Sequence, residues 1–542
     1  MKKSILKKSA YLILFALLAV SFSGIISFAD AAVNIPKSSR QTIHGRILDG
    51  QGHPLVAQVQ VWYEPITDVV PAFGPQKSTG RTDNLIAMTY SNENGFYDVE
   101  VPADTLLLII THGPEWELIH KVFVIGRNQF DGLQYNVRLK QLYNLKKLGW
   151  YGGDPHSHTL HSDGYQYPSA LAKAMQAVGL SWGILTDHNS ISGGEEWHST
   201  KSGHFLPILG NEISTEASDK AAENGYGHMN QTFITALNGT HPDDANIWAR
   251  AVFDGQEDVQ RMIDATHGQG GIITINHPFQ SWDWAGRFKS WGLVKDFDAI
   301  EVWNGDPPHS LTTSTWDSSK ININTWAVQA WFEYLNAGNR MPALAGSDGH
   351  DIYGTQAYPK GKFYWTTTIG NPRTYTQCRK LNKQNLEKSL KNGQSFLTSG
   401  FGPLLLIKAG KKTPGEIVKV GEDGILKLKC EVLANQPLLK TDDGLRIIIN
   451  GQIVKRLATG TDLTFKTDVP LKIMKDSWIV AEAFGKWPMY AITNAIYVDY
   501  PPYGDWENPV WQNPVHAQEW NKFKAHPAIT IPDGPSSWKD SE

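Results

Sequence analysis

The middle of the chain has a repeated pattern in which short apolar runs end in polar phrases and alternate with helical stretches. For example, Ile184-Leu185 leads directly into Asp187-His188, and Ile273-Thr274-Ile275 leads into Asn276-His277. Repeated strand-helix units predict an α/β fold between residues 149 and 400. The expected helices span residues 168–178, 256–267, 325–336 and 374–392. Because the carboxyl ends of strands in such a fold open onto one face, we expect the polar phrases to converge there.

Histidine is concentrated in this region, since 12 of the 18 histidines lie between residues 156 and 350. A single His-x-His motif or a lone histidine would be weak support for a site, but here the candidates occur as an ordered series, and most of them end a strand-like run. The series consists of Asp154-Pro155-His156-Ser157-His158, Ser162-Asp163-Gly164, Asp187-His188-Asn189, Gly210-Asn211-Glu212, Gly227-His228, Asn276-His277 and Ser347-Asp348-Gly349-His350. We expect the remaining histidines of this region to be surface, helix or loop residues: His161, His198, His204, His241, His267 and His309.

The residue types in the series are suited to metal ions. Imidazole and carboxylate together bind Zn, Mn or Fe. Cys378 and Cys430 are the only cysteines, which excludes a cysteine-based zinc site but leaves one disulfide open. Alternation along His156-Ser157-His158 directs both imidazoles to the same side, where they can bind the same ion. Nine ligands are more than one ion can use, so we expect two or three.

The ordered phrases resemble the PHP (polymerase and histidinol phosphatase) superfamily of metallohydrolases, and the flanking regions with an export signal resemble its CehA/McbA-type branch. The resemblance implies a distorted (β/α)7 barrel with a di- or trinuclear site. Carried over by position, it places His156, His158, Glu212 and Asp348 on a first ion, Glu212, His228 and His277 on a second, and Asp163, His188 and His350 on a third. Glu212, Asp348 and His277 are the predicted catalytic residues. Pro155 departs from the family, which usually has an apolar residue there.

Five polar residues flank these phrases: Asp187, Asn189, Asn276, Glu301 and Asn304. Two interpretations are open for them. In the first, they orient the imidazoles or contact the substrate. In the second, they are ordinary caps of strand ends. Glu301 favours the first interpretation most, because a carboxylate after an apolar strand needs a partner. Trp282, Trp284, Trp303 and Trp326 could line an aromatic cleft.

The regions on either side of the α/β region have the short β-type runs of β-sandwiches. We predict five segments: a signal peptide at 1–31, an N-terminal sandwich at 32–145 that resembles the carboxypeptidase-regulatory-like module, the metallohydrolase domain at 146–400, a second sandwich at 401–500, and an extended tail at 501–542. The fold class is therefore α/β, with a PHP-type barrel flanked by two small β-sandwiches. Such sandwiches are spacers or binding modules, with carbohydrate as one candidate partner.

The N-terminus predicts export. Lys2, Lys3, Lys7 and Lys8 precede an apolar run, and Ala29-Asp30-Ala31 has the small-x-small pattern of a cleavage site. We expect cleavage after Ala31 and a secreted or periplasmic protein without a membrane association; an uncleaved anchor is the alternative. The formal net charge of −4 argues against nucleic acid as a general partner.

These observations predict a metal-dependent hydrolase that acts on a small-molecule ester. Two ions can lower the pKa of a shared water toward about 7 and so provide a metal-bound hydroxide. A phosphoester is the preferred substrate because a cationic cluster matches an anionic transition state. The alternatives are hydrolysis of a carboxyl or carbamate aryl ester at the same site, and a non-catalytic carbohydrate-binding protein.

Overall fold

A computed structural model of the chain describes residues 40–63, 69–70, 74–75, 85–126, 132–215, 226–237, 253, 255–279, 287–305, 307–309, 323–352, 368–486, 489–504 and 506–522. The predicted signal peptide, His241, Trp282 and Trp284 lie outside these residues. None of the described helices is long and apolar enough to cross a membrane. Cys378 and Cys430 are both buried and are not joined to each other.

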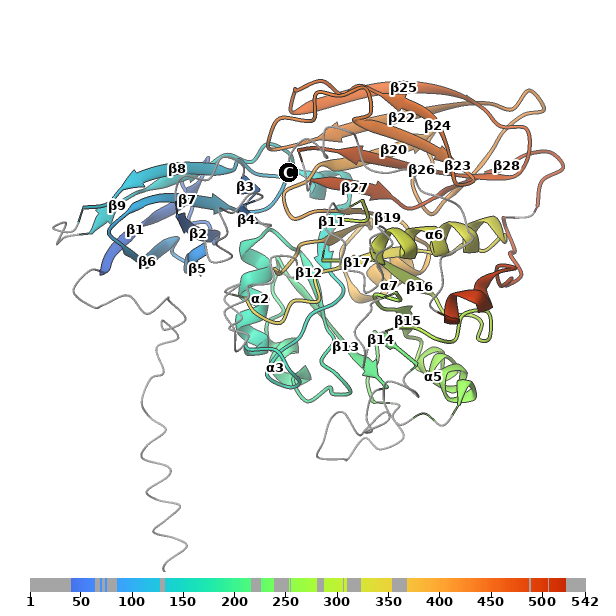
Figure 1. Cartoon of the computed structure of the whole chain (residues 1–542), viewed down its shortest axis with the longest axis horizontal. Coiled ribbons are helices and arrows are strands. Elements are labelled where there is room, and N and C mark those ends of the chain that lie inside the picture. The colour runs from blue at the N-terminus through green and yellow to red at the C-terminus, as the bar shows by residue number, and fades with distance from the viewer. Residues whose placement is uncertain are drawn as a thin grey trace, which may run out of the picture.

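The N-terminal region is a β-sandwich of two four-stranded sheets (Figure 1). One sheet contains β1 (Arg40–Asp49), β6 (Phe96–Pro102), β9 (Leu133–Gln134) and β10 (Val137–Leu139), and the other contains β2 (Gln58–Tyr63), β5 (Leu85–Tyr90), β7 (Thr105–Thr111) and β8 (Ile119–Val124). Buried residues alternate along β1 and β6, as expected for strands with one face on a core. A separate pair is formed by β3 (Val69–Val70) and β4 (Gly74–Pro75).

The middle region is built on a run of seven neighbouring strands. In sheet order they are β17 (Ala343–Gly346), β16 (Ala299–Asn304), β15 (Ile272–Ile275), β14 (His228–Thr232), β13 (Leu206–Ser214), β12 (Trp182–Leu185) and β11 (Trp150–Asp154). The five helices described there are α2 (Pro168–Ala177), α3 (Gly194–Ser199), α5 (Gln256–Gly268), α6 (Ile323–Asn336) and α7 (Lys383–Lys391), and a short 3-10 helix, η2 (Leu145–Leu148), precedes β11. Most of these strands are buried along their whole length, which explains their continuous apolar runs.

The structure does not show the predicted (β/α)7 barrel. β14 is antiparallel to both β13 and β15, whereas the other neighbours in the run are parallel. The sheet also continues past β11 into β18 (Arg373–Gln377) and β19 (Ser395–Thr398), so the described strands form one open path. The helix expected at 374–392 is wrong in its first part, because Thr374, Tyr375 and Thr376 pair with β11 as a strand.

The C-terminal region continues this sheet and also has a second sheet of its own. β19 pairs with β27 (Tyr490–Thr493), and the sheet continues in the order β26 (Ser477–Phe484), β23 (Leu445–Ile449) and β24 (Gln452–Leu457). A branch leaves β26 through β28 (Ile496–Asp499), which pairs with β21 (Ile417–Lys419). β20 (Leu404–Ala409), β22 (Ile425–Leu433) and β25 (Thr464–Lys472) form a second sheet above it (Figure 1). The Asn450-Gly451 turn joins β23 to β24 as an antiparallel hairpin.

Long-range contacts join the C-terminal region to the middle region. The amide side chain of Asn494 accepts a hydrogen bond from Ala343 N at 2.7 Å and donates one to Ala343 O at 2.9 Å. The tail, including the 3-10 helix η5 (Ala517–Lys522), places Trp506 and Trp520 in the same apolar cluster as α6 and β26. One apolar cluster therefore contains residues of both regions, while the C-terminal region has a second cluster of its own.

Candidate metal centre

The direction of each strand explains why the predicted ligands meet at one edge of the sheet. The ligands that follow β11, β12, β15 and β17 lie at carboxyl ends, and Glu212 lies near the carboxyl end of β13. β14 runs in the opposite direction, so its first residue, His228, is at the same edge. All nine predicted ligands thus fall within four overlapping groups, one of which joins His156 and His277 to Glu301. Around their carboxylates the nine ligands form three groups.

The first group contains the four ligands predicted for the first ion: His156, His158, Glu212 and Asp348. Glu212 Oε2 lies 3.2 Å from His156 Nε2 and 3.3 Å from His158 Nε2. Asp348 Oδ1 lies 3.3 Å and 2.9 Å from the same two nitrogens. The backbone bridge between Ser157 and Gly349 brings the two segments together. Two imidazoles and two carboxylates therefore point at one position.

The second group is arranged around the other oxygen of Glu212. Glu212 Oε1 lies 3.1 Å from His228 Nδ1 and 3.1 Å from His277 Nε2, which are the partners predicted for a second ion. His188 Nδ1 also lies 3.2 Å from Glu212 Oε2. Glu212 is thus the carboxylate that the first two groups share, as expected for a bridging ligand.

The third group surrounds Asp163. The carboxylate oxygens of Asp163 lie 3.2 Å from His350 Nε2, 3.6 Å from His188 Nε2 and 3.7 Å from His158 Nδ1. Asp163 has 38% of its side chain exposed, against 19% for His350 and 6% for His188. The third group is therefore on the side of the centre that faces solvent.

Several polar atoms in these groups are suited to metal ions because they are buried without a hydrogen bond from the described residues. They are His156 Nε2, both ring nitrogens of His158, Glu212 Oε2 and His277 Nδ1. Buried polar groups are nearly always hydrogen-bonded, so a cluster of exceptions requires an explanation. Divalent cations held between these atoms would satisfy most of them, and the donor set fits that group.

The electrostatics of the centre favour positive charge at these positions. Burial alone would lower the pKa of His156, but the charges of Asp348, Glu212 and Glu301 outweigh it and raise this pKa well above its usual value. Burial would also lower the pKa of His158, but the nearby carboxylates of Asp348 and Glu212 outweigh it and raise this pKa to about 10. Burial would raise the pKa of Glu212, yet the surrounding imidazoles hold it well below its usual range. A metal cation would take the place of these protons.

Three of the five flanking residues contact ligands directly. Glu301 Oε1 lies 2.9 Å from His156 Nδ1, and Glu301 Oε2 accepts the backbone N–H of His277 at 2.9 Å. Asn276 Nδ2 donates to Glu212 Oε1 at 2.8 Å. Asn304 Nδ2 donates to Glu301 Oε2 at 3.1 Å and to Asp348 Oδ2 at 3.3 Å. These contacts fit the orienting role.

The other two flanking residues organise loops. Asp187 accepts hydrogen bonds from the backbone and hydroxyl of Thr159, both at 2.7 Å, and from Ser162 Oγ at 2.8 Å. These bonds order the loop that carries Asp163. Asn189 bonds the backbone N–H and C=O of Ser214, so it joins the segment after β12 to the end of β13.

Some supporting residues were missed by sequence reasoning. Ser214 Oγ contacts His188 Nδ1, which leaves His188 Nε2 to face Asp163. Asp154 bonds Ser347 beneath the first group. His309, expected at the surface or in a loop, is buried and lies 2.9 Å from Glu482 Oε1. Asp154 and Ser347 do belong to the quoted phrases, and that position was the available signal.

The aromatic cleft is wrong for the two tryptophans that can be placed. Trp303 is fully buried and Trp326 nearly so, and both belong to the large apolar cluster of the middle region. Trp303 also donates its indole N–H to Gly305 O and packs on Tyr490. Their bulk stabilises the core and lines no opening.

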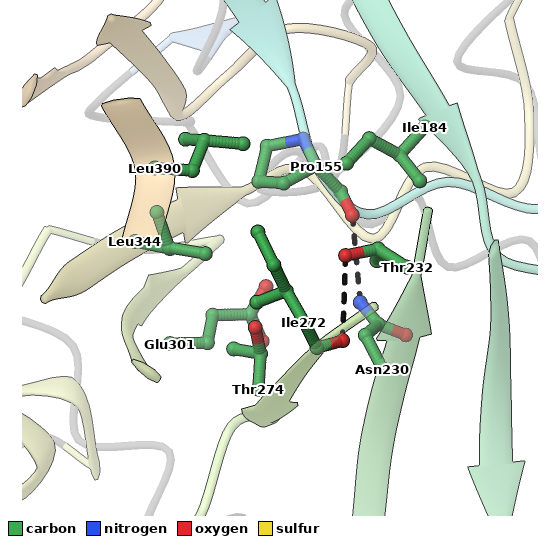
Figure 2. Close-up of a pocket in the computed structure, with 9 residues that line it drawn as sticks. All are labelled: Pro155, Ile184, Asn230, Thr232, Ile272, Thr274, Glu301, Leu344 and Leu390. Atoms are coloured by element: carbon green, nitrogen blue, oxygen red, sulfur yellow. Dashed lines mark hydrogen bonds between the residues drawn. The ribbon is translucent and has the colours of Figure 1, made fainter. Parts of the chain in front are cut away.

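A small cavity between the strands is lined by Pro155 and Glu301, among other residues (Figure 2). Pro155 is at its upper edge, and its carbonyl accepts a hydrogen bond from Asn230 Nδ2 at 3.4 Å. β11 ends at Asp154, so Pro155 lies just beyond the strand and removes no ladder hydrogen bond. The departure from the family pattern at this position therefore leaves His156 and His158 correctly directed.

Comparisons with known proteins find similarity only among solved structures. No protein-family model matches the chain, and no curated protein matches it. A two-domain protein from Bacteroides vulgatus that contains a predicted PHP-like metal-dependent phosphoesterase is 16% identical, with a TM-score of 0.32 over 62% of this chain and 90% of that one. A putative metal-dependent phosphoesterase from Bifidobacterium adolescentis is 16% identical, with a TM-score of 0.25 over 40% and 92%. An amidohydrolase from Chromobacterium violaceum is 15% identical, with a TM-score of 0.26 over 39% and 89%. At these values the similarities establish neither a shared fold nor a shared activity.

Proposed function

We propose that the protein is a metal-dependent hydrolase and that its substrate is a phosphoester. The observation that carries this proposal is the convergence of nine His, Asp and Glu side chains into overlapping groups that share His156, His158, His188 and Glu212. Divalent cations bound there would lower the pKa of a water molecule and neutralise negative charge on the substrate. The ordered phrases favour the PHP superfamily, and the flanking sandwiches with the predicted export signal favour its CehA/McbA-type branch.

The chain's own residues have distinct tasks in this proposal. Glu212 belongs to both the first and the second group, with Oε2 directed at His156 and Oε1 directed at His277. Glu301 holds the ring of His156, and Asn276 holds the carboxylate of Glu212. Asp163 and His350 are the exposed part of the centre, so the substrate would approach from their side.

Charge supports a phosphoester over a neutral substrate. Asp163, Glu212 and Asp348 are the carboxylates among the nine predicted ligands, and three divalent cations would exceed their combined negative charge. The remaining positive charge would stabilise a phosphoryl group as negative charge develops on its oxygens. Water is excluded from most of the site, because His156, His158 and Glu212 are almost fully buried, and this strengthens such interactions.

A second candidate is hydrolysis of an aryl carboxyl or carbamate ester. Leu160 is 49% exposed and Tyr165 is 57% exposed, and both lie on the loop that carries Asp163. The backbone N–H of Tyr165 bonds His350 O at 2.8 Å, so Tyr165 adjoins the exposed side of the centre. An apolar leaving group could pack there.

The test is turnover of a chromogenic phosphomonoester, a phosphodiester, an aryl ester and an aryl carbamate by purified protein. The protein is first stripped with a chelator and then supplied with Mn or Zn. We expect metal-dependent phosphoester turnover that is abolished in His158→Ala and Asp348→Asn, while His198→Ala, an exposed histidine of α3, retains it. Turnover that survives the chelator or the His158→Ala change would refute the proposal. Turnover of aryl esters alone would favour the second candidate.

We also propose that the chain is exported to a secreted or periplasmic location. This rests on residues 1–31 of the sequence.

A further inference from the structure

Asp154 is a fully buried carboxylate that none of the groups of possible ligands includes. It is the last residue of β11 and accepts four hydrogen bonds. Oδ1 accepts from Ser347 N at 3.0 Å and from His156 N at 3.3 Å. Oδ2 accepts from Ser347 Oγ at 2.6 Å and from Gly370 N at 2.9 Å. All four partners donate, which is the arrangement that suits an ionised carboxylate.

These bonds join two segments that carry ligands of the first group. His156 follows β11, and Asp348 follows Ser347 after β17. β11 and β17 stand at opposite ends of the seven-strand run and do not pair as strands. Two backbone bonds reinforce the connection, from Asp348 N to His156 O at 3.0 Å and from His158 N to Gly349 O at 3.1 Å. Asp154 is one of the side chains that bridge the two segments, together with Ser347, whose hydroxyl also lies 3.4 Å from His156 O.

Asp154 is also connected to a buried cation. Gly370 O accepts a hydrogen bond from Arg373 Nε at 2.7 Å, and Arg373 Nη1 donates to Val178 O at 2.8 Å. Arg373 is 1% exposed. Burial lowers the pKa of Arg373, while the nearby charges of Asp154 and Glu115 oppose that effect. A buried carboxylate is costly unless it is compensated; four hydrogen bonds compensate Asp154, and Arg373 adds a positive charge that is joined to it through Gly370.

The connection continues to the N-terminal region. The hydroxyl of Tyr375, on β18, lies 3.2 Å from Glu115 Oε1. Glu115 follows β7 of the N-terminal sandwich, and its other oxygen accepts Leu145 N at 2.8 Å. A chain of buried charged and polar groups thus runs from the sandwich to the metal centre.

We propose that Asp154 is a positioning residue of the metal centre, which holds Asp348 opposite His156 and His158, with Arg373 as its counter-charge. The inference rests on the proposed metal-dependent function. It gives the N-terminal sandwich a definite role, because Glu115 and Tyr375 support the arginine that compensates Asp154. Groups that orient metal ligands in this way usually change metal affinity about 10- to 100-fold when they are replaced.

The experiment compares Ser347→Ala and Asp154→Asn with the unmodified chain. Ser347→Ala removes the 2.6 Å hydroxyl bond to Asp154, together with the longer contact of the same hydroxyl with His156 O at 3.4 Å. Asp154→Asn places an amide where four donors converge, so it breaks at least one bond and opposes donor to donor. Ser181→Ala is the matched control, because Ser181 is buried at the start of β12 and its hydroxyl has no hydrogen-bond partner among the described residues.

The readout is the affinity for Mn or Zn by competition with a chromogenic chelator, with kcat measured at limiting and at excess metal. We expect Ser347→Ala to bind the first ion about 10- to 100-fold more weakly, and its lost kcat to return at excess metal. Asp154→Asn should lose about one ion per chain, as expected when a supporting carboxylate is removed. A purely structural role would lower stability without this recovery by metal.

The outcomes separate the inference from the proposed function. If the unmodified chain binds no metal, the proposed function fails first. If it binds metal and Ser347→Ala has the affinity and kcat of Ser181→Ala, the positioning role of Asp154 is overturned. Ser347→Ala decides this even where Asp154→Asn does not yield folded protein.

Discussion

Replacement of Glu301 by Gln should weaken metal binding without removing a ligand. The Glu301 carboxylate accepts from His156 Nδ1 and, through its second oxygen, from His277 N and Asn304 Nδ2. A proton on Nδ1 of His156 leaves the lone pair of Nε2 free to bind an ion. His277 has a positive φ of 25°, an unusual backbone conformation for a non-glycine residue, and its N–H is held by Glu301.

Glutamine cannot reproduce this pattern in either orientation. With its oxygen toward His156, its amide N–H groups oppose the N–H of His277 and of Asn304. With its oxygen toward those two groups, the amide donates to His156 Nδ1 and moves the ring proton to Nε2, which then cannot bind an ion. Loss of a hydrogen bond to a charged group is worth about 1.5–3 kcal/mol, which is about 10- to 150-fold in metal affinity.

The assay is a chelator competition with purified Glu301→Gln and unmodified protein. Asp298→Asn is the control, since Asp298 also pairs with a histidine, His267 Nε2 at 2.8 Å, in the same region but outside the centre. Asp298→Asn should lower stability and leave metal affinity unchanged. Equal affinity in Glu301→Gln and the unmodified chain would refute the orienting role of Glu301.

Two further outcomes are expected. The double change Asp163→Ala with His188→Ala should lower the metal content from about three to about two ions per chain. It should also reduce phosphoester turnover more than aryl-ester turnover, because a third ion would hold a phosphoryl oxygen. Elemental analysis after gel filtration measures the metal content, and two ions per chain in both proteins would refute the third site. Burial would raise the pKa of Glu482, but His309 and Arg446 lower it from the 4.5 of an unfolded chain to about 2. The ionised Glu482 therefore stabilises the folded state fully above pH 4.5, and this stabilisation is lost as the pH falls toward 2. In urea unfolding, the free energy of unfolding of Glu482→Gln should be about 3 kcal/mol lower than that of the unmodified chain at neutral pH, and this difference should narrow below pH 4.5. A difference that does not depend on pH would contradict the reasoning.

Sequence reasoning located the candidate ligands because they occur in short phrases at strand ends, where local pattern and tertiary position agree. Three expected helices match α2, α5 and α6 closely, since each has an apolar face and clear boundaries. The helix at 374–392 was too long, because pairing of β18 with β11 decides the state of Thr374, Tyr375 and Thr376. Propensity is overridden by such long-range pairing.

The supporting residues were harder to predict for the same reason. Asp154 bonds Ser347, which is 193 positions away, and His309 lies beside Glu482, which is 173 positions away. No local pattern identifies such partners. The antiparallel β14 was also unexpected, because its direction depends on how it enters the sheet between β13 and β15.

The continuous sheet has a consequence for how the chain can fold during synthesis. β11 must wait for β18, and β19 must wait for β27, because each partner strand is made much later in the chain. Ala343 finds its partner Asn494 only after 151 further residues are made. Folding of such non-local pairings is slow, and their edges are exposed to aggregation until the last strands arrive. A nascent chain stopped near residue 400 would therefore present β19 as an open edge, and we expect the middle region to require the complete chain before it becomes stable.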